Sequence, residues 1–467
     1  MSTSNGANGA NGSNGTKPTT HPLIISNKPH PTSAFFPVYS PSTGKHLHNF
    51  SSASLDDTTH AINTAQAAYP AWKSLPPSKK RDIFFRAADL FDSRKEALTK
   101  AMVEETGGAA GWAAFNLNFA SEIIRDVAGR ISSITGSIPT TSEVGTSALV
   151  YKEPYGVILA IAPWNAPYIL GTRSIAYPLA AGNTVILKAP EFSPLCSSGI
   201  VSCFHDAGLP DGVLNLLAHR AEDAATVTKH LIQDPRIKKI NFTGSTNVGK
   251  IIAETAGRNL KPILLELGGK APAIVWEDAD LELAAKECAV GAFLHAGQIC
   301  MSTERIIVHE KIVPQFEEAF KRAVAELSPS DEEPPVLINA GGVSKNQSLL
   351  KDAISKGASI IHGNPSDGEG AKMRPVIVKG VTKDMDLYYT ESFGPTVSMM
   401  TVKSEEEALE LANDTEYGLS AAVFTQDLRR ALRFAREIES GAVHINGMTV
   451  HDETALPHGG EFLSFPN

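Results

Sequence analysis

Two short stretches near the middle of the chain carry a carboxylate and a thiol that could cooperate in covalent chemistry. Glu266 stands in residues 265–270, and Cys300 closes the run 297–300. A thiolate can attack a carbonyl carbon, and a carboxylate can then activate water to release the acyl group. A lone cysteine is more often an inert core residue, because Cys is among the most buried residue types. Other parts of the chain must therefore decide between the two interpretations.

Further polar residues follow apolar runs that have the character of buried strands. Asn165 could donate a hydrogen bond to a developing oxyanion. Lys188 and Glu191 could bind ribose hydroxyls, and the helix that begins after Ser245 could receive a pyrophosphate on its free amides. Each also has a simpler interpretation, as a turn residue, a solvated charge pair or a helix cap. No Gly-x-Gly-x-x-Gly fingerprint of dinucleotide binding follows any predicted strand.

The hydrophobic pattern predicts the elements that would position these residues. Apolar residues at three- and four-residue spacing predict helices at 55–69, 77–105 and 109–134, and a short strand is predicted at 148–152. From residue 156 onward short apolar runs alternate with helices, among them 313–327 and 428–437, which predicts parallel α/β sheets. Such sheets bind nucleotides at the carboxyl ends of their strands. The predicted strands are 156–161, 184–188, 213–217, 237–242, 262–266, 273–275, 305–309, 359–362, 376–378, 396–402 and 421–424.

Composition narrows the class of protein. The chain has 467 residues, 42% hydrophobic residues and a net charge of −9, without a basic stripe, so nucleic acid is not an expected partner. No apolar run approaches the roughly 20 residues that span a bilayer, and no secretory signal is evident, so a cytoplasmic protein without membrane contact is expected. Residues 1–20 are mostly small and polar, which predicts a disordered tail.

The four cysteines lack metal-ligand spacing, and neither a metal site nor a disulfide framework is expected. Cys300 alone is expected to react quickly at neutral pH, because the pKa of a thiol falls beside donors and helix ends. The other three cysteines lie within apolar helical segments and are expected to react slowly. They are Cys196, Cys203 and Cys288.

Several motifs occur in an order and spacing that resemble those of the aldehyde dehydrogenase superfamily. They are Pro163–Asn165, Lys188–Glu191, Phe242–Thr246, Glu266–Lys270, Gly297–Cys300 and Glu391–Pro395. The resemblance implies an α/β fold with two Rossmann-like parallel-sheet domains and a small oligomerisation arm. On that basis residues 21–135 and 154–267 form an NAD-binding domain, 268–440 form a catalytic domain, and 136–153 with 441–467 form the arm.

The resemblance also implies a role for each matched residue. Cys300 stands at the nucleophile, Glu266 at the general base, and Asn165 at the side-chain donor of the oxyanion hole. The implied cofactor-binding residues are Trp164, Lys188, Glu191, Gly244, Ser245, Leu267, Glu391 and Phe393. NAD is the expected cofactor, and NADP is possible. Glu191 beside the adenosine ribose would repel a 2′-phosphate, which favours NAD.

Finer features resemble the salicylaldehyde and vanillin dehydrogenase branch of that family. They are the stretches 111–116, 166–179 and 217–223. Trp112 and Asn116 are four residues apart on a predicted helix, and with Tyr168 and Arg173 they are expected to line a slot for a flat aromatic aldehyde. Alternatively, Trp112 is ordinary helix-packing core. A semialdehyde or aliphatic substrate would leave every catalytic residue unchanged.

The resemblance becomes weaker near the end of the sequence. After Gly460 the family normally continues with a Lys-x-Ser-Gly-x-Gly-Arg-type segment and a strand that joins a neighbouring subunit, whereas residues 461–467 complete this sequence. The expected arm is therefore C-terminally truncated, which weakens the homo-oligomer that the family implies. The alternative function from this observation is a non-catalytic or unstable paralogue that at most binds nucleotide, since an unpaired sheet edge favours aggregation.

Overall fold

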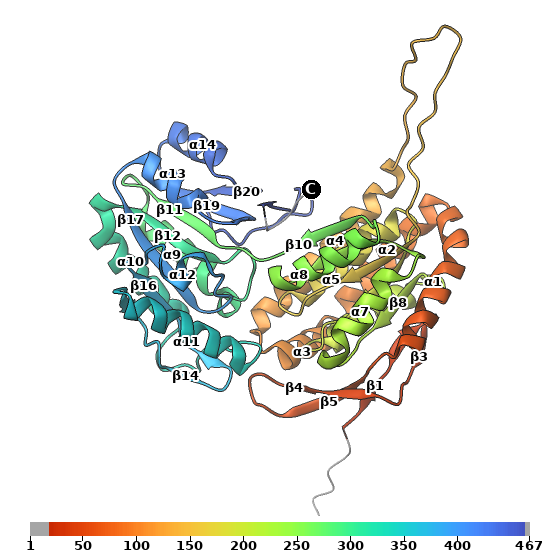
Figure 1. Cartoon of the computed structure of the whole chain (residues 1–467), viewed down its shortest axis with the longest axis horizontal. Coiled ribbons are helices and arrows are strands. Elements are labelled where there is room, and N and C mark those ends of the chain that lie inside the picture. The colour runs from red at the N-terminus through yellow and green to blue at the C-terminus, as the bar shows by residue number, and fades with distance from the viewer. Residues whose placement is uncertain (1–17, 463–467) are drawn as a thin grey trace, which may run out of the picture.

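The computed structural model describes residues 18–462 and contains two seven-stranded sheets, each covered by helices (Figure 1). The first sheet has five parallel strands and two antiparallel strands at one edge. In spatial order these are β10 (Ile263–Glu266), β9 (Ile237–Thr243), β6 (Val157–Ile161), β7 (Thr184–Lys188), β8 (Leu214–Leu217), β2 (Leu23–Ile25) and β3 (Lys28–His30). Every residue of β6 is buried, as a central strand covered on both faces requires.

The helices of this first half come from two parts of the sequence. They are α1 (Leu55–Ser74), α2 (Pro77–Ser93), α3 (Lys95–Thr106), α4 (Ala110–Arg130), α5 (Pro167–Ala180), α6 (Pro194–Asp206), α7 (Ala224–Gln233) and α8 (Thr246–Arg258). A capping box between Ser54 and Asp57 begins α1, and Pro167 occupies the first turn of α5, where its missing N–H costs nothing.

The second sheet is parallel except for one antiparallel edge strand. In spatial order its strands are β13 (Ser359–His362), β16 (Val376–Lys379), β17 (Thr396–Val402), β12 (Thr303–His309), β11 (Ala271–Val275), β19 (Ser420–Phe424) and β20 (Ala442–Ile445). Its helices are α9 (Leu281–Phe293), α10 (Val313–Leu327), α11 (Ala340–Ser355), α12 (Asp386–Tyr389), α13 (Glu405–Asn413) and α14 (Leu428–Glu437). The predicted α/β class with two parallel-sheet halves is confirmed.

Short strands complete the fold outside the two large sheets. A small sheet contains β1 (Thr20–His21), β5 (His46–Ser51) and β4 (Phe35–Tyr39), and two ladders pair β14 (Gly368–Glu369) with β15 (Lys372–Met373) and β18 (Tyr417–Gly418) with β21 (Glu461–Phe462). Residues 1–17 of the predicted disordered tail lie outside the described residues, and Thr20 within that prediction already begins β1. No helix within residues 18–462 is long and apolar enough to cross a membrane.

Two predicted elements differ in the structure. The helix predicted at 77–105 is divided at Arg94, whose backbone (φ −101°, ψ 9°) leaves the helical region between α2 and α3. The strand predicted at 148–152 makes only an isolated bridge between Val150 and Ser137. This segment extends away from the body (Figure 1), where few backbone groups find a partner.

The predicted division into cofactor domain, catalytic domain and arm stays a prediction. The segment 136–153 exposes large apolar side chains, as an oligomerisation arm would: Ile138 is 76% and Tyr151 is 73% exposed. The other predicted part of the arm, 441–467, begins differently: β20 pairs in parallel with β19 and so extends the second sheet.

Candidate active site

A tight chain reversal after α9 delivers Cys300 to the site. The helix ends at Phe293, and His295 and Ala296 then adopt left-handed backbone angles with φ of 50° and 56°. Gly297 follows at φ 72°, and a Cβ there would lie 2.2 Å from the carbonyl oxygen of Gly394. Only glycine fits both the angle and the close approach.

Cys300 lines a cavity of about 220 Å³ with residues that follow the carboxyl ends of β6, β9 and β10. The cavity is lined by Pro163, Trp164, Asn165, Leu170, Thr243, Gly244, Ser245, Leu267, Gly268, Cys300, Lys345, Glu391 and Phe393. Six of the eight predicted cofactor-binding residues therefore meet beside the predicted nucleophile. We call this space the thiol cavity. Lys345, from α11, is a lining residue that the sequence did not indicate.

The two remaining predicted cofactor residues, Lys188 and Glu191, do not line the thiol cavity. Lys188 ends β7, and burial lowers the pKa of its ammonium although Glu191 opposes the shift. Glu191 lines a separate cavity of about 730 Å³ with Phe192 and Ala221. A ligand that reaches both Glu191 and Cys300 must therefore be extended.

Ser245 occupies the N-cap position of α8, but its side chain makes no capping hydrogen bond, so the predicted side-chain cap is wrong. Its hydroxyl instead belongs to the lining of the thiol cavity. The N-terminal amides of α8 consequently receive nothing from this side chain. Amides of that kind attract anions, since they carry the positive end of the helix dipole.

A buried ion pair fixes the loop that carries Glu391 and Phe393. Lys270 Nζ lies 2.5 Å from Glu304 Oε2, and both side chains are almost fully buried. Glu304 Oε1 accepts hydrogen bonds from the backbone N–H groups of Ser392 at 2.7 Å and Phe393 at 3.1 Å. The pair thereby stabilises the left-handed backbone of Phe393 (φ 46°), and sequence patterns gave no sign that Glu304 had this role.

Glu391 is held by one backbone contact to the loop between β10 and β11. Its Oε1 accepts a hydrogen bond of 2.8 Å from the N–H of Gly269. Burial raises the pKa of this carboxyl to about 7, and the nearby charge of Glu304 adds to the shift. Trp164 and Phe393 contact each other edge to face with ring centroids 5.9 Å apart, which closes one wall of the thiol cavity.

Asn165 is fixed from two directions. Its side-chain Nδ2 donates to the backbone carbonyl oxygen of Gln298 at 2.9 Å. The backbone carbonyl oxygen of Asn165 accepts a hydrogen bond from Trp112 Nε1 at 3.0 Å. The side chain is only 4% exposed and lines both small cavities that contain Cys300. A primary amide has two N–H groups, so one bond to Gln298 leaves a donor for another oxygen.

A second small cavity, of about 50 Å³, meets Cys300 from the side of α4. It is lined by Trp112, Phe115, Phe119, Asn165, Ala166, Ile169, Leu170, Arg173, Ile299, Cys300, Met301, Val450, His451, Asp452 and His458. Trp112 stacks on Phe115 with ring centroids 5.5 Å apart and an interplanar angle of 17°, and Phe115 stacks on Phe119 at 6.0 Å. We call this space the aromatic slot. It contains two of the four predicted substrate residues, Trp112 and Arg173.

The other two predicted substrate residues do not line the aromatic slot. Tyr168 is fully buried on another side of α5, where its hydroxyl donates to the carbonyl oxygen of Leu98 at 2.7 Å and its ring packs against Phe91. Asn116 is also fully buried, and its amide donates to the carbonyl oxygen of Trp112, one helical turn earlier. Both predictions failed because these side chains face the helical core.

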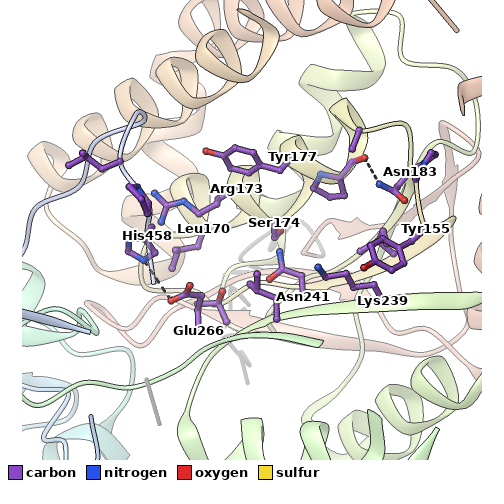
Figure 2. Close-up of a pocket in the computed structure, with 18 of the residues that line it drawn as sticks. Tyr155, Leu170, Arg173, Ser174, Tyr177, Asn183, Lys239, Asn241, Glu266 and His458 are labelled. Carbon is purple, nitrogen blue, oxygen red and sulfur yellow. Dashed lines mark hydrogen bonds and ion pairs between the residues drawn. The ribbon is translucent and has the colours of Figure 1, made fainter. Parts of the chain in front are cut away.

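Glu266 ends β10 beside a third cavity, of about 530 Å³, whose lining is shown in Figure 2. We call this space the large cavity, because it is larger than the thiol cavity and the aromatic slot. The residue is 8% exposed, and its Oε2 has no hydrogen-bond partner among the described residues. Burial raises the pKa of the carboxyl to about 7, although His458 and Arg173 oppose the shift. A carboxylate in this state is a stronger base than one in water.

The thiol of Cys300 is not pre-ionised in the structure. Burial raises its pKa to about 12, and the carboxyl groups of Glu266 and Glu391 add to the rise while Arg173 opposes it. The expected fall in the pKa of this thiol is therefore wrong, because burial disfavours the thiolate and two carboxyl groups oppose the effect of Arg173. Cys300 still differs from the other cysteines in exposure, since it alone among the described thiols is partly accessible.

Alkylation should consequently be selective but slow. We expect iodoacetamide to label Cys300 before the buried Cys196, Cys203 and Cys288, with a rate that rises about tenfold per pH unit between pH 7 and 9. The reason is that only the thiolate reacts, and its fraction grows with pH below the pKa. Mass-spectrometric peptide mapping measures each site. A rate that is already constant above pH 7, or label on Cys288 first, contradicts this expectation.

A thiol therefore lies beside the carboxyl edge of a parallel sheet, the edge at which sheets of this kind bind nucleotides. Residues 28–465 match the model of the "Aldehyde dehydrogenase family", and the chain belongs to that family.

Known relatives place the chain near enzymes that act on aromatic aldehydes. It is 45% identical over 446 residues to a vanillin dehydrogenase from Pseudomonas sp. (strain HR199), with 94% of this chain and 92% of that protein covered. It is 42% identical over 416 residues to a salicylaldehyde dehydrogenase from Pseudomonas putida, which covers 87% and 85% of the two chains. The crystal structure of a salicylaldehyde dehydrogenase from Pseudomonas putida G7 complexed with salicylaldehyde superposes with a TM-score of 0.93 at 38% identity, covering 96% of this chain and 94% of that one. The predicted resemblance to this branch is confirmed.

Proposed function

We propose that the protein oxidises an aromatic aldehyde to the carboxylic acid with NAD, through a thiohemiacetal and then a thioester on Cys300. One observation supports the proposal most directly: Cys300 lines both the thiol cavity and the aromatic slot, so ligands in the two spaces share this residue. The names of the relatives support an aromatic substrate. Enzymes of this family use a nicotinamide dinucleotide as cofactor. The choice of NAD over NADP for this chain is part of the proposal.

The residues present fit a nicotinamide dinucleotide. Ser245 and the free amides of α8 suit a pyrophosphate, Glu191 suits ribose hydroxyls, and Glu391 with Phe393 suits the nicotinamide end in the thiol cavity. The separation of Glu191 from the thiol cavity agrees with the length of such a molecule. When bound, the dinucleotide accepts the hydride released from the substrate carbon.

The residues around Cys300 account for formation of the covalent intermediate. The thiol must first lose its proton, since its pKa is about 12, and the carboxyl groups of Glu266 and Glu391 are the nearby bases. Sulfur then attacks the carbonyl carbon, and negative charge develops on the carbonyl oxygen. Asn165 is held rigidly beside the sulfur and can donate its second amide N–H to that oxygen, together with the backbone N–H of Cys300.

Release of the acid requires water and a base. Glu266 lies at a cavity large enough to hold several water molecules, and its raised pKa allows it to take a proton from water. The water oxygen attacks the thioester carbon, and the sulfur leaves as thiolate. Because this base is present, we infer hydrolysis to a free acid as the outcome.

The aromatic slot favours a flat aldehyde over a semialdehyde. The stacked rings of Trp112, Phe115 and Phe119 present parallel apolar faces. Arg173 is the cation that could recognise the carboxylate of a semialdehyde, but its guanidinium already binds Asp452. A ring is therefore accommodated more readily than a second carboxylate.

Replacing Trp112 with alanine tests the substrate class. We expect kcat/KM for benzaldehyde-type substrates to fall about 10- to 100-fold, since losing a buried aromatic contact costs roughly 1.5–3 kcal/mol, while the value for a short aliphatic aldehyde changes less than about threefold. Steady-state NADH formation with both substrates provides the measurement. Phe85→Ala, at an exposed position of α2, is the matched control. Equal losses for the two substrates would show that Trp112 acts only as helix-packing core.

Replacing Glu191 with serine tests the cofactor. Wild-type protein should show the higher kcat/KM with NAD, because like charges about 4 Å apart repel by on the order of 1 kcal/mol in water. Glu191→Ser removes the repulsion and should narrow the ratio of kcat/KM with NAD to kcat/KM with NADP by roughly fivefold. Glu222→Ser removes an exposed carboxylate close by in the sequence and should leave the ratio unchanged. A wild-type enzyme that works better with NADP would refute the assignment of Glu191.

A further inference from the structure

Glu266 faces a histidine that no step of the chemistry above uses. His458 Nε2 lies 3.8 Å from Glu266 Oε2, and the two side chains meet at one end of the large cavity (Figure 2). They come from distant parts of the sequence, Glu266 from β10 and His458 from the segment after β20, and their side chains are only 10% and 13% exposed, respectively. This separation is longer than a hydrogen bond but within the range of an ion pair.

The imidazole of His458 is itself held in place. Its Nδ1 lies 3.4 Å from Asp452 Oδ2, and the same carboxylate oxygen binds the guanidinium of Arg173. Burial alone would raise the pKa of Asp452, but the hydrogen bond from His458 and the charges of Arg173 and His458 lower it to about 2. Asp452 is therefore a permanent carboxylate behind the ring. It orients Nε2 toward Glu266 and stabilises a positive charge on the imidazole.

We propose that His458 is the positioning residue that accepts the proton from Glu266 after each hydrolysis and passes it to water in the large cavity. The inference rests on the proposed function, because it requires Glu266 to act as the base.

The proton passes from water through Glu266 and His458 to the solvent. Water loses one proton to the Glu266 carboxylate as its oxygen bonds to the thioester carbon. The carbon–sulfur bond breaks, and its electron pair returns to Cys300. The proton on Glu266 moves to Nε2 of neutral His458, and the imidazolium gives a proton to water. Both side chains then regain their starting states, and nothing is oxidised or reduced.

Three observations favour His458 over a merely structural partner. Glu266 Oε2 has no hydrogen-bond partner among the described residues, so the nearest group able to take its proton is this imidazole. Asp452 lies behind the ring and, as a carboxylate, stabilises the positive charge that the imidazole gains when it accepts a proton. His458 also lines both the large cavity and the aromatic slot, so it connects the reacting centre with a water-accessible space.

Other charged groups around the pair define its electrostatic setting. The titratable groups that face it or share its cavities are Arg173 and Tyr177 from α5, Lys239 from β9, Glu153 and Tyr155 before β6, Cys300, and His451, Asp452 and Glu453 from the C-terminal segment. Among them only Asp452 contacts His458 directly in an ion pair. Lys239 lies toward the opposite end of the cavity in Figure 2.

The test replaces His458 with glutamine, which keeps a polar side chain but cannot take up the proton. We expect kcat to fall about 10- to 100-fold, less than the loss of the general base itself, because water can still accept the proton slowly, while KM for the aldehyde changes less than about twofold. Hydride transfer precedes hydrolysis, so a burst of NADH equal to the site concentration should appear. Thermal melting of His458→Gln checks that the fold is intact, and His60→Gln, at an exposed position of α1, is the matched control.

Chemical rescue distinguishes proton transfer from a structural role, because added imidazole restores kcat only if the missing group transferred a proton. Adding imidazole to His458→Ala should restore kcat at least about fivefold, and the rescue should grow with the concentration of the neutral base, because the large cavity admits a small molecule. Unchanged kcat in His458→Gln, loss of the burst, or no rescue by imidazole would overturn the inference. If wild-type protein shows no aldehyde oxidation at all, the proposed function fails instead, so the two failures are distinguishable.

Discussion

Protein carrying Cys300→Ala is expected to lose aldehyde oxidation by on the order of 10⁴-fold or more in kcat/KM, because no other group can form the thiohemiacetal. Binding of the dinucleotide should persist, since the residues assigned to it belong to other segments around the thiol cavity. NADH formation and a thermal shift with NAD measure the two properties separately.

The control for this substitution is Cys288→Ala. Cys288 is fully buried in α9, where it packs in the core of the second half, so its replacement should lower the melting temperature but leave kcat/KM within about twofold. A Cys300→Ala protein that keeps wild-type turnover would show that the nucleophile lies elsewhere.

The second large effect is expected from Glu266→Gln. Its kcat should fall about 10²- to 10⁴-fold, the range for losing a general base. The first turnover should survive as a burst of NADH, because hydride leaves before water attacks. Stopped-flow absorbance of NADH separates the burst from the steady state. Glu254→Gln, which alters an exposed carboxylate on α8, should behave as wild type.

The pH dependence of the same variant gives an independent check. The pKa of Glu266 is raised to about 7, so the basic carboxylate is lost as the pH falls through 7. The rate of hydrolysis in wild-type protein should then decline about tenfold per pH unit below pH 7. The residual rate of Glu266→Gln should not show this decline. A wild-type rate that is independent of pH between 5 and 7 would contradict the role of this carboxyl.

The sequence predicted long, strongly patterned elements well. The limits of β7, β17, α10 and α14 agree with the predicted ranges, because turn residues bound each apolar or amphipathic run. The short strands β1 to β5 were missed, since strands of two to six residues acquire their identity from distant partners. The break at Arg94 was also missed, because helical spacing continues across it.

The candidate site was predictable where a motif fixes a residue and less so where packing selects it. Cys300, Glu266 and Asn165 follow from motifs. For α4 the spacing was right but the choice of face was wrong: the residues in the aromatic slot are Trp112, Phe115 and Phe119 at i, i+3 and i+7, rather than Asn116 at i+4.

The residues around Glu266 required the folded structure. His458 and Asp452 are far from Glu266 in the sequence and reach it only because the segment after β20 folds back over the cavity. The pKa of Cys300 was likewise predicted in the wrong direction, because the burial of the thiol and its two carboxyl neighbours arise only through tertiary contacts.

The most direct test of the account is the intact mass of the Glu266→Gln protein after mixing with NAD and an excess of benzaldehyde. Hydrolysis is slow in this variant, so the thioester should accumulate, and the mass should rise by one acyl group, located on the Cys300 peptide after digestion. The double variant Cys300→Ala, Glu266→Gln should gain no mass. An acyl group on any other residue, or formation of NADH without an adduct on Cys300, would contradict covalent catalysis by this thiol.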